Sequence, residues 1–191
     1  FFLLLLKSTQ MTSTFWDETL AEIKKGITER GHPFRFFTLA TIDESGSPSQ
    51  RTVVFRHFND NLSLVFYTDE RSQKVDEIDK TRAISLLFYH PENLLQITIK
   101  GKASVITDSE VLKEYWSAVP DSNKKDYTTH VAPGSTMKNP DALEYLNGDH
   151  HFCAIQIEPT SIEYLKLKRP NHIRVLFTKD NTSWEGKFLA P

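Results

Sequence analysis

Cationic and hydroxyl side chains gather in one short stretch of the chain, between residues 51 and 74. The stretch carries Arg51, Arg56, Thr68, Arg71, Ser72 and Lys74. Arginine and lysine supply positive charge to a bound phosphate, and serine and threonine hydroxyls supply directed hydrogen bonds. The stretch therefore predicts a phosphate-binding site, although the residue types alone are equally typical of surface cations on a half-exposed strand.

The elements that must position these groups are two strands and the start of a helix. Residues 51–58 and 62–68 are rich in aromatic and β-branched side chains and flank a short Asn/Asp turn, a pattern typical of a β-hairpin. A short helix is predicted over residues 69–80. Because successive side chains of a strand point to opposite faces, Arg51 and Arg56 can share a ligand only if one lies beyond the strand end or at a bulge.

The rest of the chain favours an antiparallel β-barrel with flanking helices. Further strands are predicted over residues 34–42, 83–89, 94–106, 152–159, 161–167 and 173–179, with a last piece around Trp184. Helices are predicted from Ser13 or Thr14 to Gly31, from Asp108 to the residue before Pro120, and over residues 141–146. Short strands joined by hairpin turns favour a closed or nearly closed antiparallel barrel over a parallel sheet. Neither G-x-G-x-x-G nor G-x-x-x-x-G-K-[ST] occurs, which excludes Rossmann and P-loop nucleotide sites.

Composition is typical of one soluble globular domain. The 191 residues are 39% hydrophobic and 25% charged, and the formal charge of -2 argues against a nucleic-acid surface, which needs a basic excess. Cys153 is the only cysteine, so no intrachain disulfide can form, and a reducing cytoplasm is the expected location.

The first ten residues differ from the remainder. Residues 1–6 are apolar but too few to span a bilayer, and they lack the features of a signal peptide. Because Met11 resembles a natural start, we interpret residues 1–10 as an upstream or non-native extension and residues 11–191 as a single domain without membrane association. A hydrophobic anchor is the alternative.

Other residues with chemical potential are fewer. Gln96 interrupts an apolar strand and is either a partner for a flavin ring or an outward-facing side chain in simple alternation. Adjacent histidines at 150 and 151 point apart on a strand, so no metal site is predicted. Ser135 lies in a loop without the strand–turn–helix context of a nucleophilic serine, so no catalytic residue is assigned.

Several segments, taken in order, resemble the pyridoxamine 5'-phosphate oxidase-like FMN-binding split-barrel family. They are residues 51–56, 66–68, 72–74, 96, 101–103, 114–117, 159–164, 169–171 and 189–191. The resemblance implies a six-stranded antiparallel split β-barrel that forms a homodimer with FMN at the subunit interface. The cofactor-binding residues that it implies are Arg51, Val53, Val54, Arg56, Tyr67, Thr68, Ser72, Gln73, Lys74, Gln96, Gly134 and Ser135.

The resemblance is weaker in the substrate half of the site. The first run ends in Arg56 where the family has a lysine, an arginine that holds the substrate phosphate is Val119, and a ring-stacking tryptophan is Leu165. Leu176 replaces an FMN-contacting arginine, and residues 172–174 read His-Ile-Arg where the family has Arg-Leu-His. The resemblance therefore implies an FMN-binding flavoprotein and oxidoreductase acting on an unidentified small molecule. A true pyridoxamine 5'-phosphate oxidase with rearranged substrate contacts, or a non-catalytic flavin-binding module, are the alternatives.

Overall fold

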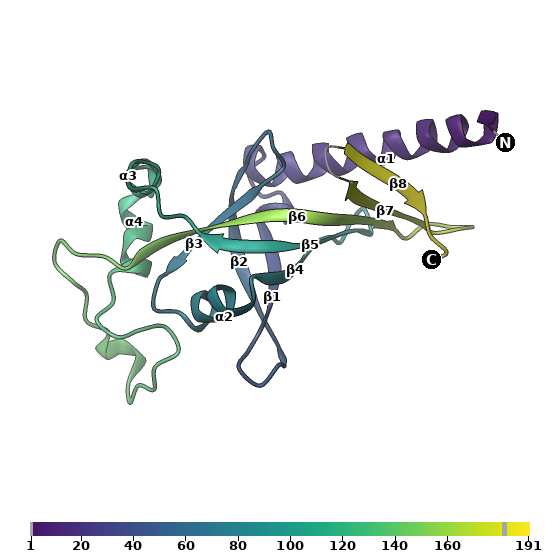
Figure 1. The fold of residues 1–191 in the computed structure, drawn as a ribbon. Coiled ribbons are helices and arrows are strands. Elements are labelled where there is room, and N and C mark those ends of the chain that lie inside the picture. The colour runs from purple at the N-terminus through teal and green to yellow at the C-terminus, as the bar shows by residue number, and fades with distance from the viewer. Residues whose placement is uncertain (1, 181–182) are drawn as a thin grey trace.

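The fold is a single antiparallel sheet that closes on itself. The computed structural model describes the backbone of residues 2–180 and 183–191, and the side chains of that range from Thr12 onward. The strands are β1 (Phe36–Ile42), β2 (Pro48–Phe58), β3 (Leu64–Asp69), β4 (Ala83–His90), β5 (Leu95–Val105), β6 (Phe152–Lys166), β7 (Ile173–Asp180) and β8 (Ser183–Phe188). Their order is β3-β2-β1-β4-β5-β6-β7-β8, and β3 also pairs with β6 (Figure 1). Six strands thus form a closed barrel, β7 and β8 extend it, and the predicted split barrel is confirmed.

Helices lie outside the barrel. They are α1 (Phe2–Thr28), α2 (Gln73–Thr81), α3 (Ser109–Ala118) and α4 (Asp121–Lys124), with the 3-10 turns η1 (Pro33–Arg35), η2 (Lys125–Tyr127) and η3 (Pro140–Ala142). Within the described residues, no helix combines the length and the apolar character needed to cross a bilayer.

The helix predictions are partly wrong. The first helix was expected to begin at Ser13 or Thr14, but α1 begins at Phe2. The leucines, lysine, glutamine and methionine that precede Ser13 in the sequence are good helix formers, so the helix extends over them. The helix predicted over residues 141–146 is only the short turn η3. The predicted cap of α3 is confirmed, since the Asp108 carboxylate accepts hydrogen bonds from the backbone N–H groups of Glu110 and Val111.

Strand β6 runs the length of the molecule as one element (Figure 1). The sequence predicted two strands here, residues 152–159 and 161–167 with a break at Thr160, and this prediction is wrong. Pro159 pairs with Gly101 of β5, where the register shifts. A side chain at position 101 would place its Cβ 2.2 Å from the carbonyl oxygen of Glu158, so the strands approach closely only because that residue is glycine.

The barrel interior is filled by aromatic rings from neighbouring strands. The ring centroid of Phe37 lies 6.1 Å from that of Phe55, 6.0 Å from that of Phe66 and 5.3 Å from that of Phe88. These side chains are at most 1% exposed. The high phenylalanine content of the sequence therefore builds the core, and polar functional groups must lie at the barrel ends or on its outer face.

Candidate cofactor site

The end of β3 and the start of α2 bring three of the predicted phosphate-binding residues together. The Lys74 Nζ donates to the Thr68 Oγ1 at 2.9 Å, and the Thr68 and Ser72 hydroxyl oxygens lie 3.2 Å apart. Ser72 is the N-cap residue of α2, but its side chain makes no capping hydrogen bond. The first N–H groups of the helix therefore have no side-chain cap, and the positive end of the helix dipole adds to the lysine charge. Gln73 is exposed in the first turn.

The electrostatics of this cluster fit a phosphate. Burial lowers the pKa of Lys74, and the nearby positive charge of Arg51 lowers it further. Two neighbouring cations in a partly desolvated position repel each other, and an anion placed against them relieves that repulsion. Lysine, hydroxyl groups and an uncapped helix N-terminus form the donor set that a phosphate group requires.

Arg51 is less available than the sequence suggests. Its Nη1 donates to Thr41 Oγ1 and, at 3.0 Å, to the backbone oxygen of Ser49; its Nη2 donates to Ser49 Oγ at 2.8 Å and to Glu77 Oε2 at 2.9 Å. A guanidinium has five N–H donors, so only the Nε–H is left without an acceptor in this arrangement. Arg51 therefore supplies charge and at most one donor to a ligand beside Lys74, unless its contacts change.

Val53 and Val54 lie on opposite faces of β2. Val53 belongs to the buried core, whereas Val54 is half-buried on the outer face. Of the two, only Val54 can line a ligand outside the barrel, so the predicted pair does not act together.

Because of a bulge in β2, the side chains of Arg56 and His57 both contact Tyr67 on the outer face of the barrel. The register to β3 shifts between Phe55 and His57. The Arg56 guanidinium carbon lies 5.4 Å from the ring centroid of Tyr67, and the His57 Nε2 lies 2.5 Å from the Tyr67 hydroxyl oxygen. Arg51 and Arg56 therefore serve different sides of the barrel wall, and the bulge directs two consecutive side chains to one tyrosine.

In the aromatic cluster around Tyr67, burial favours the uncharged forms of His57 and Tyr67. The His57 ring stacks on that of Tyr115 with centroids 4.4 Å apart. Burial lowers the pKa of His57, and the positive charge of Arg56 lowers it further. Burial raises the pKa of Tyr67. Both side chains are therefore neutral near pH 7 and can share a single hydrogen bond.

Gln96 lies far from the phosphate cluster within one chain. Strand β6 pairs with both regions, because Thr68 is opposite Cys153 and Gln96 is opposite Leu165. These two β6 positions are about 40 Å apart along the strand at roughly 3.3 Å per residue. Gln96 and Thr68 of the same chain therefore do not contact one small ligand.

The loop that carries Gly134 and Ser135 is fastened close to the phosphate cluster. Arg71 forms an ion pair with Asp69 at 2.7 Å and donates to the backbone oxygens of Thr129 at 2.8 Å and His130 at 3.0 Å. Among the residues that the structure describes, no hydrogen bond joins Gly134 or Ser135 to Thr68, Ser72 or Lys74. Arg71, which the sequence placed with the phosphate-binding cations, is instead a structural anchor for this loop.

Comparison with known proteins identifies the family. Residues 13–107 match the family model described as pyridoxamine 5'-phosphate oxidase, FMN-binding domain. A pyridoxine/pyridoxamine 5'-phosphate oxidase of Shewanella pealeana is 31% identical over 169 residues, which cover 81% of this chain and 78% of the relative. The chain belongs to the pyridoxamine 5'-phosphate oxidase family. The oxidase of Aliivibrio fischeri strain MJ11 is 30% identical over the same shares of both chains.

Solved structures of this oxidase family share the fold. An FMN-binding protein of Nostoc punctiforme, related to pyridoxamine 5'-phosphate oxidase, has a TM-score of 0.79 at 24% identity and covers 92% of this chain and 97% of its own. PhzG of Burkholderia lata, solved with tetrahydrophenazine-1-carboxylic acid, has a TM-score of 0.75 at 23% identity, with coverages of 96% and 93%. At these identities the likeness shows the fold alone. The predicted cofactor, FMN, is confirmed by the family model.

Sequence reasoning missed several residues that the structure places in contact with the predicted cofactor residues. Glu77 follows Lys74 by three positions on α2, a spacing that puts two side chains on one helix face and could have revealed it. His57 and Tyr115 carried no such signal, because their contact depends on the bulge in β2 and on how α3 packs against the barrel.

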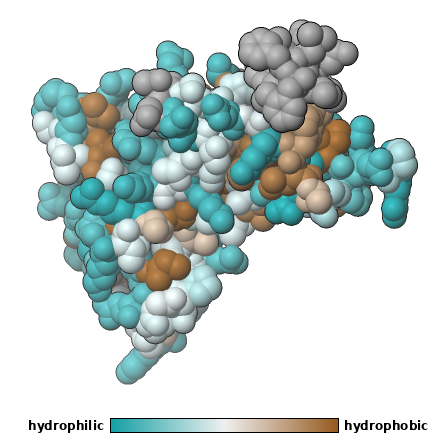
Figure 2. All heavy atoms as spheres, turned by 45° about the vertical axis from the view of Figure 1, so that its right-hand side comes forward, coloured by the Kyte–Doolittle hydropathy of each residue, from teal (hydrophilic) through white to brown (hydrophobic). Residues whose placement is uncertain are grey.

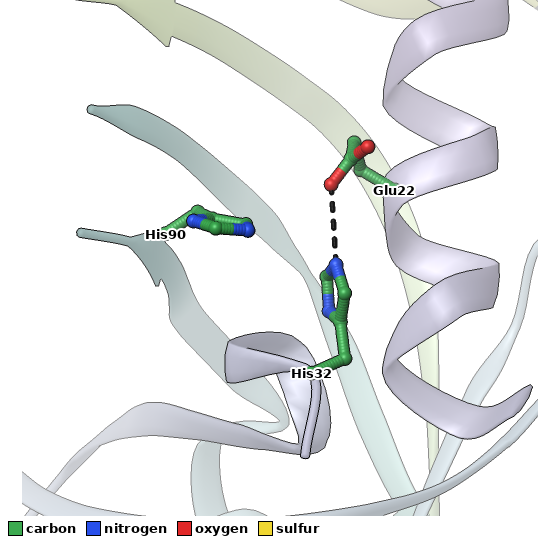
Figure 3. Close-up of side chains that lie close together, drawn as sticks. All are labelled: Glu22, His32 and His90. Atoms are coloured by element: carbon green, nitrogen blue, oxygen red, sulfur yellow. Dashed lines mark hydrogen bonds and ion pairs between the residues drawn. The ribbon is translucent and has the colours of Figure 1, made fainter. Parts of the chain in front are cut away.

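A cluster of Glu22, His32 and His90 has the composition of a metal site (Figure 3). The hydrogen bonds of the two histidines argue against metal binding. The Nδ1 of His32 accepts from the Phe34 N–H at 3.2 Å, and the Nδ1 of His90 accepts from the Asn93 N–H at 3.3 Å. A neutral imidazole that accepts at Nδ1 carries its proton on Nε2, which then cannot bind a metal ion. The His32 Nε2, 3.3 Å from the Glu22 carboxylate, instead donates to it and joins α1 to the barrel.

Cys153 lies opposite Thr68 and should be chemically inert. Burial raises the pKa of its thiol to about 12. Its thiolate fraction at pH 8 is therefore about 10³-fold below that of an exposed cysteine, and we expect labelling by a disulfide reagent to be slowed by a similar factor. The labelling rate of the folded protein, compared with that in denaturant, measures this, and rapid stoichiometric labelling of the folded protein would contradict it.

Proposed function

We propose that this chain is a cytoplasmic FMN-dependent oxidoreductase that acts on a small molecule. The observation that carries the proposal is the cluster of buried Thr68 and Ser72 with half-buried Lys74 at the start of α2, within the segment that matches an FMN-binding domain. In the proposed site these residues hold the flavin phosphate, and Val54 and Tyr67 lie along the ring. The bound flavin supplies the electron-transfer chemistry, while the protein positions the substrate and excludes water.

The proposed active form is a homodimer in which each flavin contacts both chains. The separation of Gln96 from the phosphate cluster supports this, since Gln96 can reach a flavin only if that flavin is held by a second chain. Figure 2 shows apolar patches on a largely hydrophilic face. Large exposed apolar side chains near Gln96 include Tyr89, which is its partner in the β4–β5 ladder, and Leu94 and Leu167, which are joined by a backbone hydrogen bond.

The substrate half of the site does not favour a phosphorylated substrate. Val119, at the position of a phosphate-binding arginine in the family, is 5% exposed and packs with Val65 and Tyr127. Arg174 could have replaced a lost arginine, but its guanidinium donates to both carboxylate oxygens of Glu163, at 3.1 and 3.2 Å. We therefore propose a substrate other than pyridoxamine 5'-phosphate.

Two measurements test this function. The purified protein should contain flavin or take up added FMN, with the absorbance of a flavoprotein; a protein that remains colourless contradicts the proposal. With FMN bound and the substrate below saturation, oxygen-dependent formation of pyridoxal 5'-phosphate should stay below about 1% of the rate of the Shewanella pealeana relative, because each lost charged hydrogen bond weakens substrate binding by about 10- to 100-fold and a phosphate-binding arginine makes more than one. A comparable rate would instead identify a true pyridoxamine 5'-phosphate oxidase. FMN binding without reduction by NADH or NADPH, and without a spectral change on addition of candidate substrates, would favour a non-catalytic flavin-binding module.

A further inference from the structure

Glu77 is a buried carboxylate that pairs with Arg51 beside the phosphate cluster. Its side chain is 2% exposed, and its Oε2 accepts from the Arg51 Nη2 at 2.9 Å and from the Thr41 hydroxyl. Its Oε1 is buried and has no hydrogen-bond partner in the part of the chain that the structure describes. A buried, half-satisfied carboxylate is costly, so its position beside a proposed anion site calls for a physical explanation.

A negative charge, that of Glu77, lies beside the two cations of the proposed phosphate site, Arg51 and Lys74. Lys74 is close enough to experience both the positive charge of Arg51 and the negative charge of Glu77. Arg51, Lys74 and Glu77 together carry a net charge of about +1 if each is ionised. A phosphate that approaches Lys74 therefore meets a guanidinium that is already paired and a carboxylate that repels it.

We propose that Glu77 is a specificity-determining counter-charge, which occupies Arg51 and thereby limits how strongly this site prefers a phosphorylated flavin over an unphosphorylated one. The inference rests on the proposed FMN site. The phosphate of FMN competes with Glu77 for Arg51, whereas riboflavin, which has the same ring and no phosphate, does not. Glu77 thus sets the ratio between the affinities for FMN and riboflavin without touching the flavin ring.

The experiment is the substitution Glu77→Gln, with dissociation constants for FMN and riboflavin measured by quenching of flavin fluorescence. Glutamine keeps an oxygen that can accept from Arg51 but removes the charge. FMN should bind about tenfold more tightly, and riboflavin should change less than about twofold, because only the phosphate feels the lost charge. Asp76→Asn is the matched control: it removes the same charge from a solvent-exposed position of α2, where screening makes both changes small.

The affinities of the variant and of the wild-type protein decide the outcome. An unchanged ratio of FMN to riboflavin affinity in the Glu77→Gln protein overturns the proposal. Weaker FMN binding also overturns it, and would mean that the Glu77 carboxylate aligns Arg51 for the phosphate. Thermal unfolding establishes that the variant is folded. If it is not, the wild-type ratio decides: a preference for FMN below about 10³-fold supports a neutralised Arg51, and a larger one overturns it. A wild-type protein that binds neither flavin contradicts the proposed function itself.

Discussion

Replacing Lys74 with methionine should raise the dissociation constant for FMN by about 100-fold and leave that for riboflavin almost unchanged. Methionine keeps the length of the side chain but removes the charge and the hydrogen bond to Thr68. Fluorescence titration with the two flavins measures the effect. Lys80→Met is the matched control, since Lys80 lies on the same helix but pairs with Glu44 at the surface.

The protonation of Lys74 should also make the affinity for FMN depend on pH. In the flavin-free protein the pKa of Lys74 is lowered by burial and by Arg51, and a bound phosphate must raise it. Above the second pKa of the phosphate, about 6, we therefore expect FMN affinity to be complete while Lys74 is charged and to fall as the pH rises through the lowered pKa of Lys74, and we expect riboflavin affinity not to follow this course. A Lys74→Met protein with the wild-type pH profile for FMN would show that another group binds the phosphate.

Replacing Arg51 with alanine should destabilise the flavin-free protein by about 3–5 kcal/mol, because it leaves Glu77 as a buried carboxylate without its cation. Urea unfolding followed by circular dichroism measures the change in the free energy of unfolding. The double variant Arg51→Ala/Glu77→Gln should recover part of the loss, since the remaining buried group is then neutral. A loss below about 1 kcal/mol for Arg51→Ala would mean that water or another side chain compensates Glu77.

The parts of the site that the sequence predicted are local. Thr68, Ser72 and Lys74 lie within one strand end and one helix turn, so their types and spacing were enough to bring them together. Most strands were also predicted, because alternation and turn residues are encoded within each hairpin. The family resemblance supplied the six-stranded split-barrel form and the cofactor.

The parts that the sequence did not predict depend on partners distant in the chain. The bulge that turns both Arg56 and His57 toward Tyr67 arises from the register between β2 and β3. The pairing of Arg51 with Glu77 requires α2 to pack against β1 and β5, which no local pattern encodes. The continuity of β6 through Pro159 depends on a glycine in the neighbouring strand.

The pairing of β3 with β6 has a consequence for the order of assembly. This seam joins residues 64–69 to residues 152–157, so its closure carries a larger loop entropy than any hairpin of the barrel. Thr68 lies on the seam, opposite Cys153. Because Thr68 pairs with β6 and not with β2, we expect the predicted phosphate site to be held in its final place only once this seam has closed, and a chain with folded hairpins but an open seam to bind FMN weakly.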